Sequence, residues 1–309
     1  QYLSETKHDD TSHIQQISRV EEDRYVWLDR FTIRNLELLF SPNDGATTLI
    51  DILDSTVSPM GSRLLKRWMV LPLKDKLKID QRLGVVEYLI EHHDTAQEIS
   101  LQIKHIGDLE RLIGKVAVGR ANPRELIQVK RALEAIVPIK SYCGNSRNKE
   151  LEQIAEQLNP CEKIRNRLAL EIQDDPPLLI TKGNVIADGV NEELDELRKI
   201  AFAGKDYLLE IQARETEATG IASLKISYNN VFGYFLEVRN AYKDKVPETW
   251  IRKQTLTQAE RYITEELKEY EAKILGAEEK IQAIEARLYG ELVSDVAEYV
   301  APIQLNSRL

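Results

Sequence analysis

The sequence Leu224-Lys-Ile-Ser-Tyr-Asn-Asn-Val-Phe-Gly-Tyr-Phe-Leu-Glu-Val238 differs in pattern from the rest of the chain. Apolar and polar residues alternate over 224–228 and again over 232–238, which is typical of half-buried strands. The pair Asn229-Asn230 separates the two runs, and Asn favours turns because it tolerates a positive φ. Residues 249–256 can form a third strand. We therefore predict a small antiparallel sheet inside a helical protein.

This region also differs in charge from the rest of the chain. Residues 222–258 contain six bases and three acids, a balance of +3, whereas the whole chain of 309 residues carries −9 and the remainder therefore −12. A basic, aromatic-containing module in an acidic protein favours a polyanionic partner. Ordinary solvated lysines on a sheet would give the same count, so charge alone leaves both interpretations open.

A capping signature and an apolar seam predict a long helix after the sheet. Thr257 and Glu260 form a Thr-x-x-Glu capping box, in which each side chain satisfies a backbone amide at the other position. We predict one helix from Thr257 to about Val296. The seam has the 3.5-residue period of a coiled coil and consists of Ile263, Leu267, Tyr270, Ile274, Ala277, Ile281, Ile284 and Leu288.

A second seam of similar period precedes the sheet. Asn191 is the predicted N-cap of this helix and Gly220 its predicted C-terminal stop. Two seams that flank a small sheet most simply form an antiparallel pair, which places the sheet at the tip of a helical stalk. The residues of the second seam are Leu194, Leu197, Ala201, Gly204, Leu208, Ile211 and Ala218.

The remainder of the chain is also helical in pattern, so the predicted fold class is mainly α. Ser58-Pro59 and Asn122-Pro123 have the form of helix starts, with a capping side chain followed by proline at the first helical position. The helix after Asn122 is predicted to run to about Pro138. Further helical patterns cover residues 79–106, 108–116 and 149–173.

The sequence shows no pattern of catalytic, metal-binding or membrane-spanning residues. It lacks a G-x-x-x-x-G-K-[ST] phosphate loop, and its five histidines have no metal-ligand spacing with Cys143 and Cys161. Two cysteines fit a reducing compartment, so we expect a cytoplasmic protein. No run approaches the roughly 18–20 apolar residues of a membrane span. We expect neither enzymatic activity nor a cofactor in this chain.

Several segments resemble motifs of the MutS family of DNA mismatch-repair proteins, of bacterial type. The resemblance implies a helical core, long antiparallel lever helices, and a small β clamp at their tip that closes over duplex DNA. It implies a core at residues 1–190, a lever and clamp at 191–265, and a returning lever with the second part of the core at 266–309. The segments occur in family order and are Ser55–Trp68, Ile106–Leu112, Arg120–Leu126, Asn191–Arg198, Arg252–Ile263 and Glu266–Glu271.

The resemblance also implies that this chain is a fragment of a longer protein. In the family, a mismatch-reading domain precedes this region, and an ATPase domain with the main dimer interface follows it, so ATP and Mg²⁺ are expected there. The implied partners are double-stranded DNA containing mismatches, a second MutS copy and a MutL-type protein. Gly233–Glu237 fits the family's mismatch-reading string G-x-F-x-E. Its place in the clamp strand predicts ordinary sheet residues instead.

Basic and polar residues of the clamp are the expected DNA contacts. Phosphate contacts of this kind set position and affinity but carry no base information. For each single residue, a solvated side chain remains the alternative. A second class of function also stays open, namely a coiled-coil structural protein whose aromatic tip, with Phe232, Tyr242 and Trp250, binds another protein. The expected DNA contacts are Lys225, Arg239, Arg252, Lys253, Gln254, Thr255 and Gln258.

Overall fold

The computed structural model describes residues 24–229, 231 and 233–309. The chain divides into two compact units, one comprising Gln1–Leu179 with Tyr289–Leu309 and the other Ile180–Leu288. The domain boundaries expected at residues 190 and 265 stay a prediction. The predicted turn residue Asn230, the aromatic residue Phe232 and the N-terminal connector lie outside the described residues.

The first unit is built from helices around α8, which packs against α6, α7, α9 and α10. Leu126, Leu133 and Ile136 of α8 are fully buried in this core. The C-terminal residues complete the unit, since the Tyr289 hydroxyl donates to the Ala121 carbonyl at 2.8 Å. The helices of this unit are α2 (Arg30–Asn35), α3 (Leu49–Leu53), α4 (Pro59–Val70), α5 (Lys76–Glu91), α6 (His93–Ile106), α7 (Leu109–Ala117), α8 (Pro123–Gly144), α9 (Lys149–Gln157), α10 (Glu162–Glu171) and α13 (Val300–Asn306).

The predicted starts of α4 and α8 are confirmed. Ser58 Oγ accepts from the Gly61 amide at 3.1 Å, and Asn122 and Glu125 cap each other's backbone amides. The predicted end of α8 at Pro138 is wrong, because the helix continues to Gly144. Proline removes one backbone hydrogen bond, but buried residues beyond it, such as Ile139, hold the last turns against the core.

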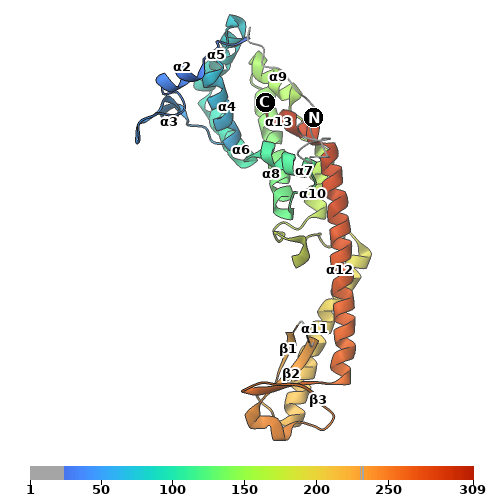
Figure 1. Cartoon of the computed structure of the whole chain (residues 1–309). Coiled ribbons are helices and arrows are strands. Elements are labelled where there is room, and N and C mark those ends of the chain that lie inside the picture. The colour runs from blue at the N-terminus through green and yellow to red at the C-terminus, as the bar shows by residue number, and fades with distance from the viewer. Residues whose placement is uncertain (1–23, 230, 232) are drawn as a thin grey trace, which may run out of the picture. The chain divides into compact units, whose positions relative to one another are not determined.

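Helix α12 spans Glu265–Glu298, and its part in the second unit, up to Leu288, forms an antiparallel pair with α11 (Glu192–Thr219) (Figure 1). Near the sheet, Arg214 pairs with Glu266, and farther along the helices Lys205 pairs with Glu278 at 2.7 Å. Both predicted ends of α11 are confirmed: Asn191 accepts from the Leu194 amide at 2.9 Å, and Gly220 ends the helix in the left-handed conformation.

Residues of the two predicted seams meet between these helices. Gly204 of α11 faces Ile274 of α12 so closely that a Cβ on Gly204 would lie 2.5 Å from Ile274 Cγ1. The seams fail near their ends, because Ala218 is exposed and Ile263 lies in a strand. Buried members of the two seams are Leu194, Ala201, Gly204, Leu208, Ile211, Leu267, Ile274 and Ala277.

The sheet has four antiparallel strands in the order β1-β2-β4-β3. The prediction of a mainly α fold with a small antiparallel sheet is confirmed, although a three-stranded sheet was expected. A 3₁₀ helix, η3 (Asn240–Lys245), follows β2, and another, η2 (Ile180–Lys182), precedes α11. The strands are β1 (Lys225–Asn229), β2 (Gly233–Arg239), β3 (Ile251–Thr255) and β4 (Ala259–Ile263).

The predicted helix start at Thr257 is wrong, because strand β4 occupies the first turns of the expected helix. Helix α12 begins at Glu265, and the side chain of Thr264 caps it by accepting from the Leu267 amide at 3.1 Å. Glu260 of the expected capping box pairs with Arg252 at 3.5 Å instead. The Thr-x-x-Glu pattern is a local signal, and pairing with β2 and β3 outweighed it.

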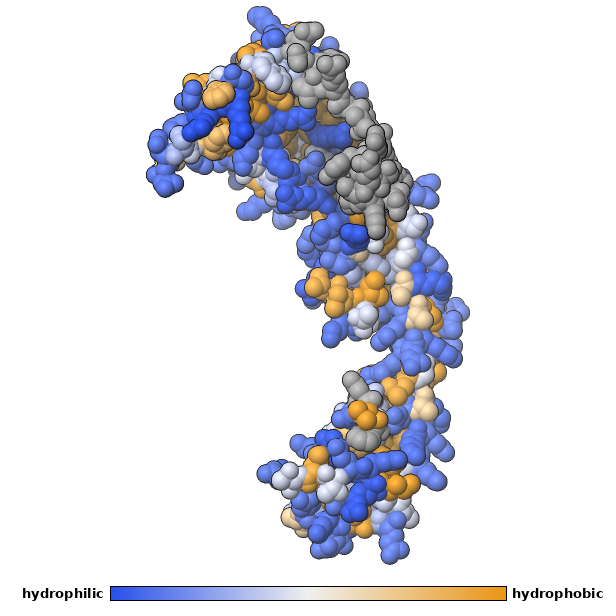
Figure 2. Space-filling view, in the orientation of Figure 1, coloured by the Kyte–Doolittle hydropathy of each residue, from blue (hydrophilic) through white to orange (hydrophobic). Residues whose placement is uncertain are grey.

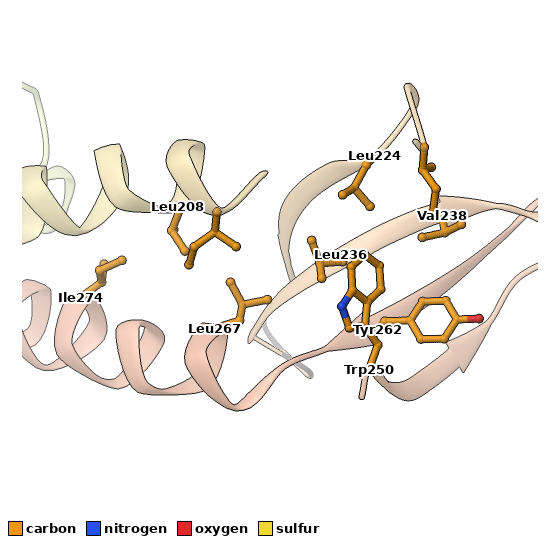
Figure 3. Packing of buried hydrophobic residues seen from close by; sticks show 10 residues of the cluster. Leu208, Leu224, Leu236, Val238, Trp250, Tyr262, Leu267 and Ile274 are labelled. Carbon is orange, nitrogen blue, oxygen red and sulfur yellow. The ribbon is translucent and has the colours of Figure 1, made fainter. Parts of the chain in front are cut away.

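One face of the sheet packs on the ends of both helices (Figure 3). Leu236 and Tyr262 on this face adjoin Trp250, whose ring centre lies 6.0 Å from that of Tyr262. Burial of these apolar side chains fixes the sheet on the helix pair, since each fully buried large side chain contributes roughly 1.5–3 kcal/mol. The buried cluster comprises Leu208, Ile211, Ile221, Leu224, Leu236, Val238, Trp250, Tyr262, Leu267 and Ile274.

Candidate nucleic-acid interface

The strand register divides the predicted DNA contacts between the two faces of the sheet. Side chains alternate along a strand, and Leu236, which faces the core, is paired with Tyr262. Lys225 is paired with Glu237, one position away from Leu236, and therefore points the other way. We call this second face the outer face; it carries Lys225, Phe235, Glu237, Arg239, Gln254 and Arg261.

Arg261 is the central side chain of the outer face and was not among the predicted contacts. Its guanidinium lies 4.3 Å from the centre of the Phe235 ring. It donates to Gln254 Oε1 at 2.9 Å and to Glu237 Oε2 at 3.3 Å. Arg261 thus covers an aromatic ring and orients two polar neighbours. Residues 259–263 do not alternate strictly between apolar and polar residues, and the apparent capping box at Thr257 and Glu260 concealed this strand.

Lys225 and Arg239 give the outer face its unpaired positive charge. Both side chains are exposed, and neither has an ion-pair partner within the described ranges. The charge of Arg261 is offset by its partner Glu237. The two free bases are therefore available to an anion.

The β3–β4 turn brings Gln258 to the end of β2. The backbone amide of Asn240 donates to the Gln258 carbonyl at 3.1 Å, and the Asn240 side chain donates to the Thr257 carbonyl at 3.1 Å. Arg239, paired with Ala259, lies directly beside this turn. The structure therefore places Lys225, Arg239 and Gln254 of the predicted set on one face of the sheet, with the backbone of Gln258 beside the end of β2.

Arg252 and Thr255 belong to the opposite face. Arg252 is paired with Tyr262 and Thr255 with Glu260. The Arg252 side chain is 62% exposed and lies 3.5 Å from Glu260. Glu260 also accepts from the hydroxyl of Tyr262, and burial raises the pKa of Tyr262 to about 12, so this phenol remains a neutral donor at physiological pH.

Lys253 lies at an irregularity of β3. The register with β4 shifts between Arg252 and Gln254, so Lys253 has no partner residue opposite it in the ladder. Lys253 is exposed. A bulge of this kind breaks the simple alternation of side chains. The seven predicted contacts therefore do not form one continuous surface.

The arrangement of exposed bases fits binding of an extended anion. Among the described residues, no cluster of three or more His, Cys, Asp or Glu side chains could hold a metal ion. Phe235, which fits the mismatch-reading string, is only 2% exposed beneath Arg261, so its ring cannot stack on a base. None of the helices in the described ranges is long and apolar enough to cross a membrane.

Comparisons with known proteins identify one family. Residues 31–309 match the family model described as MutS domain III. The chain is 60% identical over 307 residues to the DNA mismatch repair protein MutS of Phocaeicola vulgatus, covering 99% of this chain and 35% of that protein. It is 56% identical over 308 residues to the MutS protein of Flavobacterium johnsoniae, covering 100% of this chain and 36% of that protein. The chain thus spans about a third of the length of these relatives.

Proposed function

The chain belongs to the MutS domain III family, and we propose that it binds the backbone of duplex DNA in mismatch repair as part of a longer protein. The observation that carries this proposal is the pair of unpaired, exposed bases Lys225 and Arg239 on the outer face of the sheet. The names of the relatives, each a DNA mismatch repair protein, support DNA as the proposed polyanion.

We propose a different part for each group of contacts. Lys225 and Arg239 bind phosphates directly, while Gln254 and Gln258 add hydrogen bonds from the same side. Arg252, Lys253 and Thr255 lie on the edge strand β3 and reach the duplex from that edge. All are contacts to the backbone, so they contribute affinity without reading sequence.

The proposed role extends to the longer protein. The helix pair α11–α12 couples the sheet to an ATPase domain outside this chain, and ATP and Mg²⁺ bind there. A second MutS copy and a MutL-type protein are the proposed partners of that longer protein. The support is family membership together with the antiparallel packing of α11 on α12.

A protein-binding tip is the alternative function, and the burial of its main aromatic residue disfavours it. Trp250 is only 7% exposed, because it packs against Tyr262 inside the unit. Tyr242 is half-buried, and Phe232 lies outside the described residues. Trp250 therefore stabilises the fold, and Tyr242 packs against the same buried cluster.

The proposal is tested by binding of the intact longer protein to a matched duplex and to the same duplex with one G·T mismatch. We expect the double substitution Lys225→Glu and Arg239→Glu to weaken binding to both duplexes by the same factor, because backbone contacts do not distinguish bases. Lys280→Glu, at an exposed lysine of α12, is the matched control and should bind like the wild type. Loss of mismatch preference with unchanged affinity for the matched duplex would overturn the proposal.

A further inference from the structure

The segment that carries α2 and α3 in the first unit exposes many large apolar side chains. Of the large apolar residues in 26–57, only Leu38 and Ile50 are buried. Figure 2 shows hydrophobic side chains, in orange, at the upper left where Figure 1 places these helices. Exposed apolar surface of this extent marks interaction sites in soluble proteins. Its most exposed members are Trp27, Phe31, Leu36, Ile52 and Leu53.

A hollow in this surface combines aromatic rings with positive charge. It has a volume of about 480 Å³ and is lined by Arg30, Phe31, Arg34, Phe40 and Pro42. Phe31 is 74% exposed and Phe40 45% exposed. Arg30 and Arg34 lie one turn apart on the same side of α2. Both are exposed, and no ion pair of either arginine occurs within the described part of the chain.

Four of the five acids in residues 26–57 form local hydrogen bonds, and the fifth, Asp44, is exposed. Asp29 accepts from the Thr32 amide at 2.6 Å, and Glu37 accepts from the Ser41 hydroxyl at 2.7 Å. Asp51 caps α3 through Thr48, and Asp54 accepts from Ser62 and Thr56. Within the described part of the chain, none of these acids lies within ion-pair distance of Arg30 or Arg34.

We propose that this hollow is the docking site of an acidic, apolar polypeptide segment from the rest of the same longer protein. A leucine or aromatic side chain of that segment enters beside Phe31 and Phe40, and a carboxylate pairs with Arg30 and Arg34. Exposed aliphatic residues such as Leu36, Ile52 and Leu53 favour a polypeptide over a nucleic acid, because they offer neither charge nor a ring for stacking.

The length of the relatives favours a segment of the same polypeptide. The chain covers only 35% of the Phocaeicola vulgatus protein and 36% of the Flavobacterium johnsoniae protein. A segment tethered to the surface meets it at a high effective concentration, in the millimolar range for a short flexible tether. Tethering keeps so apolar a surface covered, whereas a free partner would leave it open to self-association.

Photocrosslinking in the intact longer protein tests this proposal. Benzoylphenylalanine replaces Phe31, the protein is irradiated, and the crosslinked peptides are identified by mass spectrometry. We expect an intramolecular crosslink to a segment in which aspartate or glutamate adjoins a leucine or aromatic residue. Benzoylphenylalanine at Phe202 of α11, which is also an exposed phenylalanine at 68%, is the matched control and should not give this crosslink.

Charge reversal tests the part played by the arginines. Arg30→Glu with Arg34→Glu should lower the crosslink yield roughly tenfold, since two exposed ion pairs are lost and two repulsions gained. Lysine substitutions in the identified segment should restore the yield in the reversed variant, which separates lost pairing from a folding defect. The proposal is overturned by the absence of a crosslink, by a crosslink to a second copy, another protein or nucleic acid, or by a yield insensitive to charge reversal.

Discussion

Arg198 of α11 donates to Glu285 of α12, whose side chain is completely buried. The same guanidinium also donates to the carbonyl of Ile186 and to Asp188, each at 2.7 Å. One arginine thus connects the two helices to the segment that leads into α11. Glu285 Oε2 makes no hydrogen bond with any described residue, so the burial of this carboxylate depends on Arg198.

Removal of Arg198 should therefore be more damaging than removal of the whole pair. We expect Arg198→Met to lower the free energy of unfolding by about 3–5 kcal/mol, because it leaves Glu285 buried without its counterion. Adding Glu285→Met should recover most of that loss. Urea denaturation of the two variants measures both values. Equal destabilisation by the single and double substitutions would show that packing, not charge, explains the effect.

The close approach of Gly204 to Ile274 predicts opposite effects for two glycine substitutions. Alanine at Gly204 would place Cβ 2.5 Å from Ile274 Cγ1, whereas at Gly276 of α12 no atom lies within 4 Å of the new Cβ. We expect Gly204→Ala to destabilise by about 1–3 kcal/mol despite its better helix propensity. Gly276→Ala should stabilise by about 0.5–1 kcal/mol. Thermal unfolding compares the stabilities of the two variants. Stabilisation by both substitutions would mean that the helices are not in contact at Gly204.

The helix caps and strand β4 show how far the sequence predicts the fold. Asn191, Gly220, Ser58 and the Asn122 capping box were identified correctly because capping depends on residues only a few positions apart. Strand β4 was missed because its partner β2 is distant in sequence, and because Thr257 and Glu260 imitate a helix start directly after β3. The continuation of α8 past Pro138 also depends on tertiary packing that the sequence does not show.

The candidate interface was predictable by residue type but not by geometry. The bases Lys225 and Arg239 stand out in an acidic chain, and alternation gives their strands. Which bases share a face depends on the register and on the irregularity at Lys253. Arg261 could not be found while residues 259–263 were interpreted as helix.

The pairing of Glu266 predicts a pH dependence of stability. The hydrogen bond from Arg214, with a second from Tyr207, lowers the pKa of Glu266 below its ordinary value of 4.5. A carboxyl with a depressed pKa in the folded state stabilises fully above its unfolded pKa and loses that contribution as pH falls through the folded pKa. Glu266→Gln should therefore lose stability at pH 7 and show a shallower decline below pH 4.5 than the wild type.

Denaturant unfolding between pH 3 and 7 measures this difference, with Glu265→Gln as the control. Glu265 is the exposed neighbour of Glu266 at the start of α12, so its substitution should leave the pH profile close to that of the wild type. If the free energies of unfolding of Glu266→Gln and of the wild type declined in parallel as the pH falls, the interaction with Arg214 would not contribute to folding stability.

The salt dependence of duplex binding by the intact longer protein tests the central claim most directly. Each phosphate contact contributes a slope of about −0.9 to log K against log salt. If Lys225 and Arg239 both bind phosphate, the double variant Lys225→Glu and Arg239→Glu should show a slope shallower by about two units than the wild type, while Lys280→Glu keeps the wild-type slope. A double variant with the wild-type slope would contradict the assignment of the outer face to the DNA backbone.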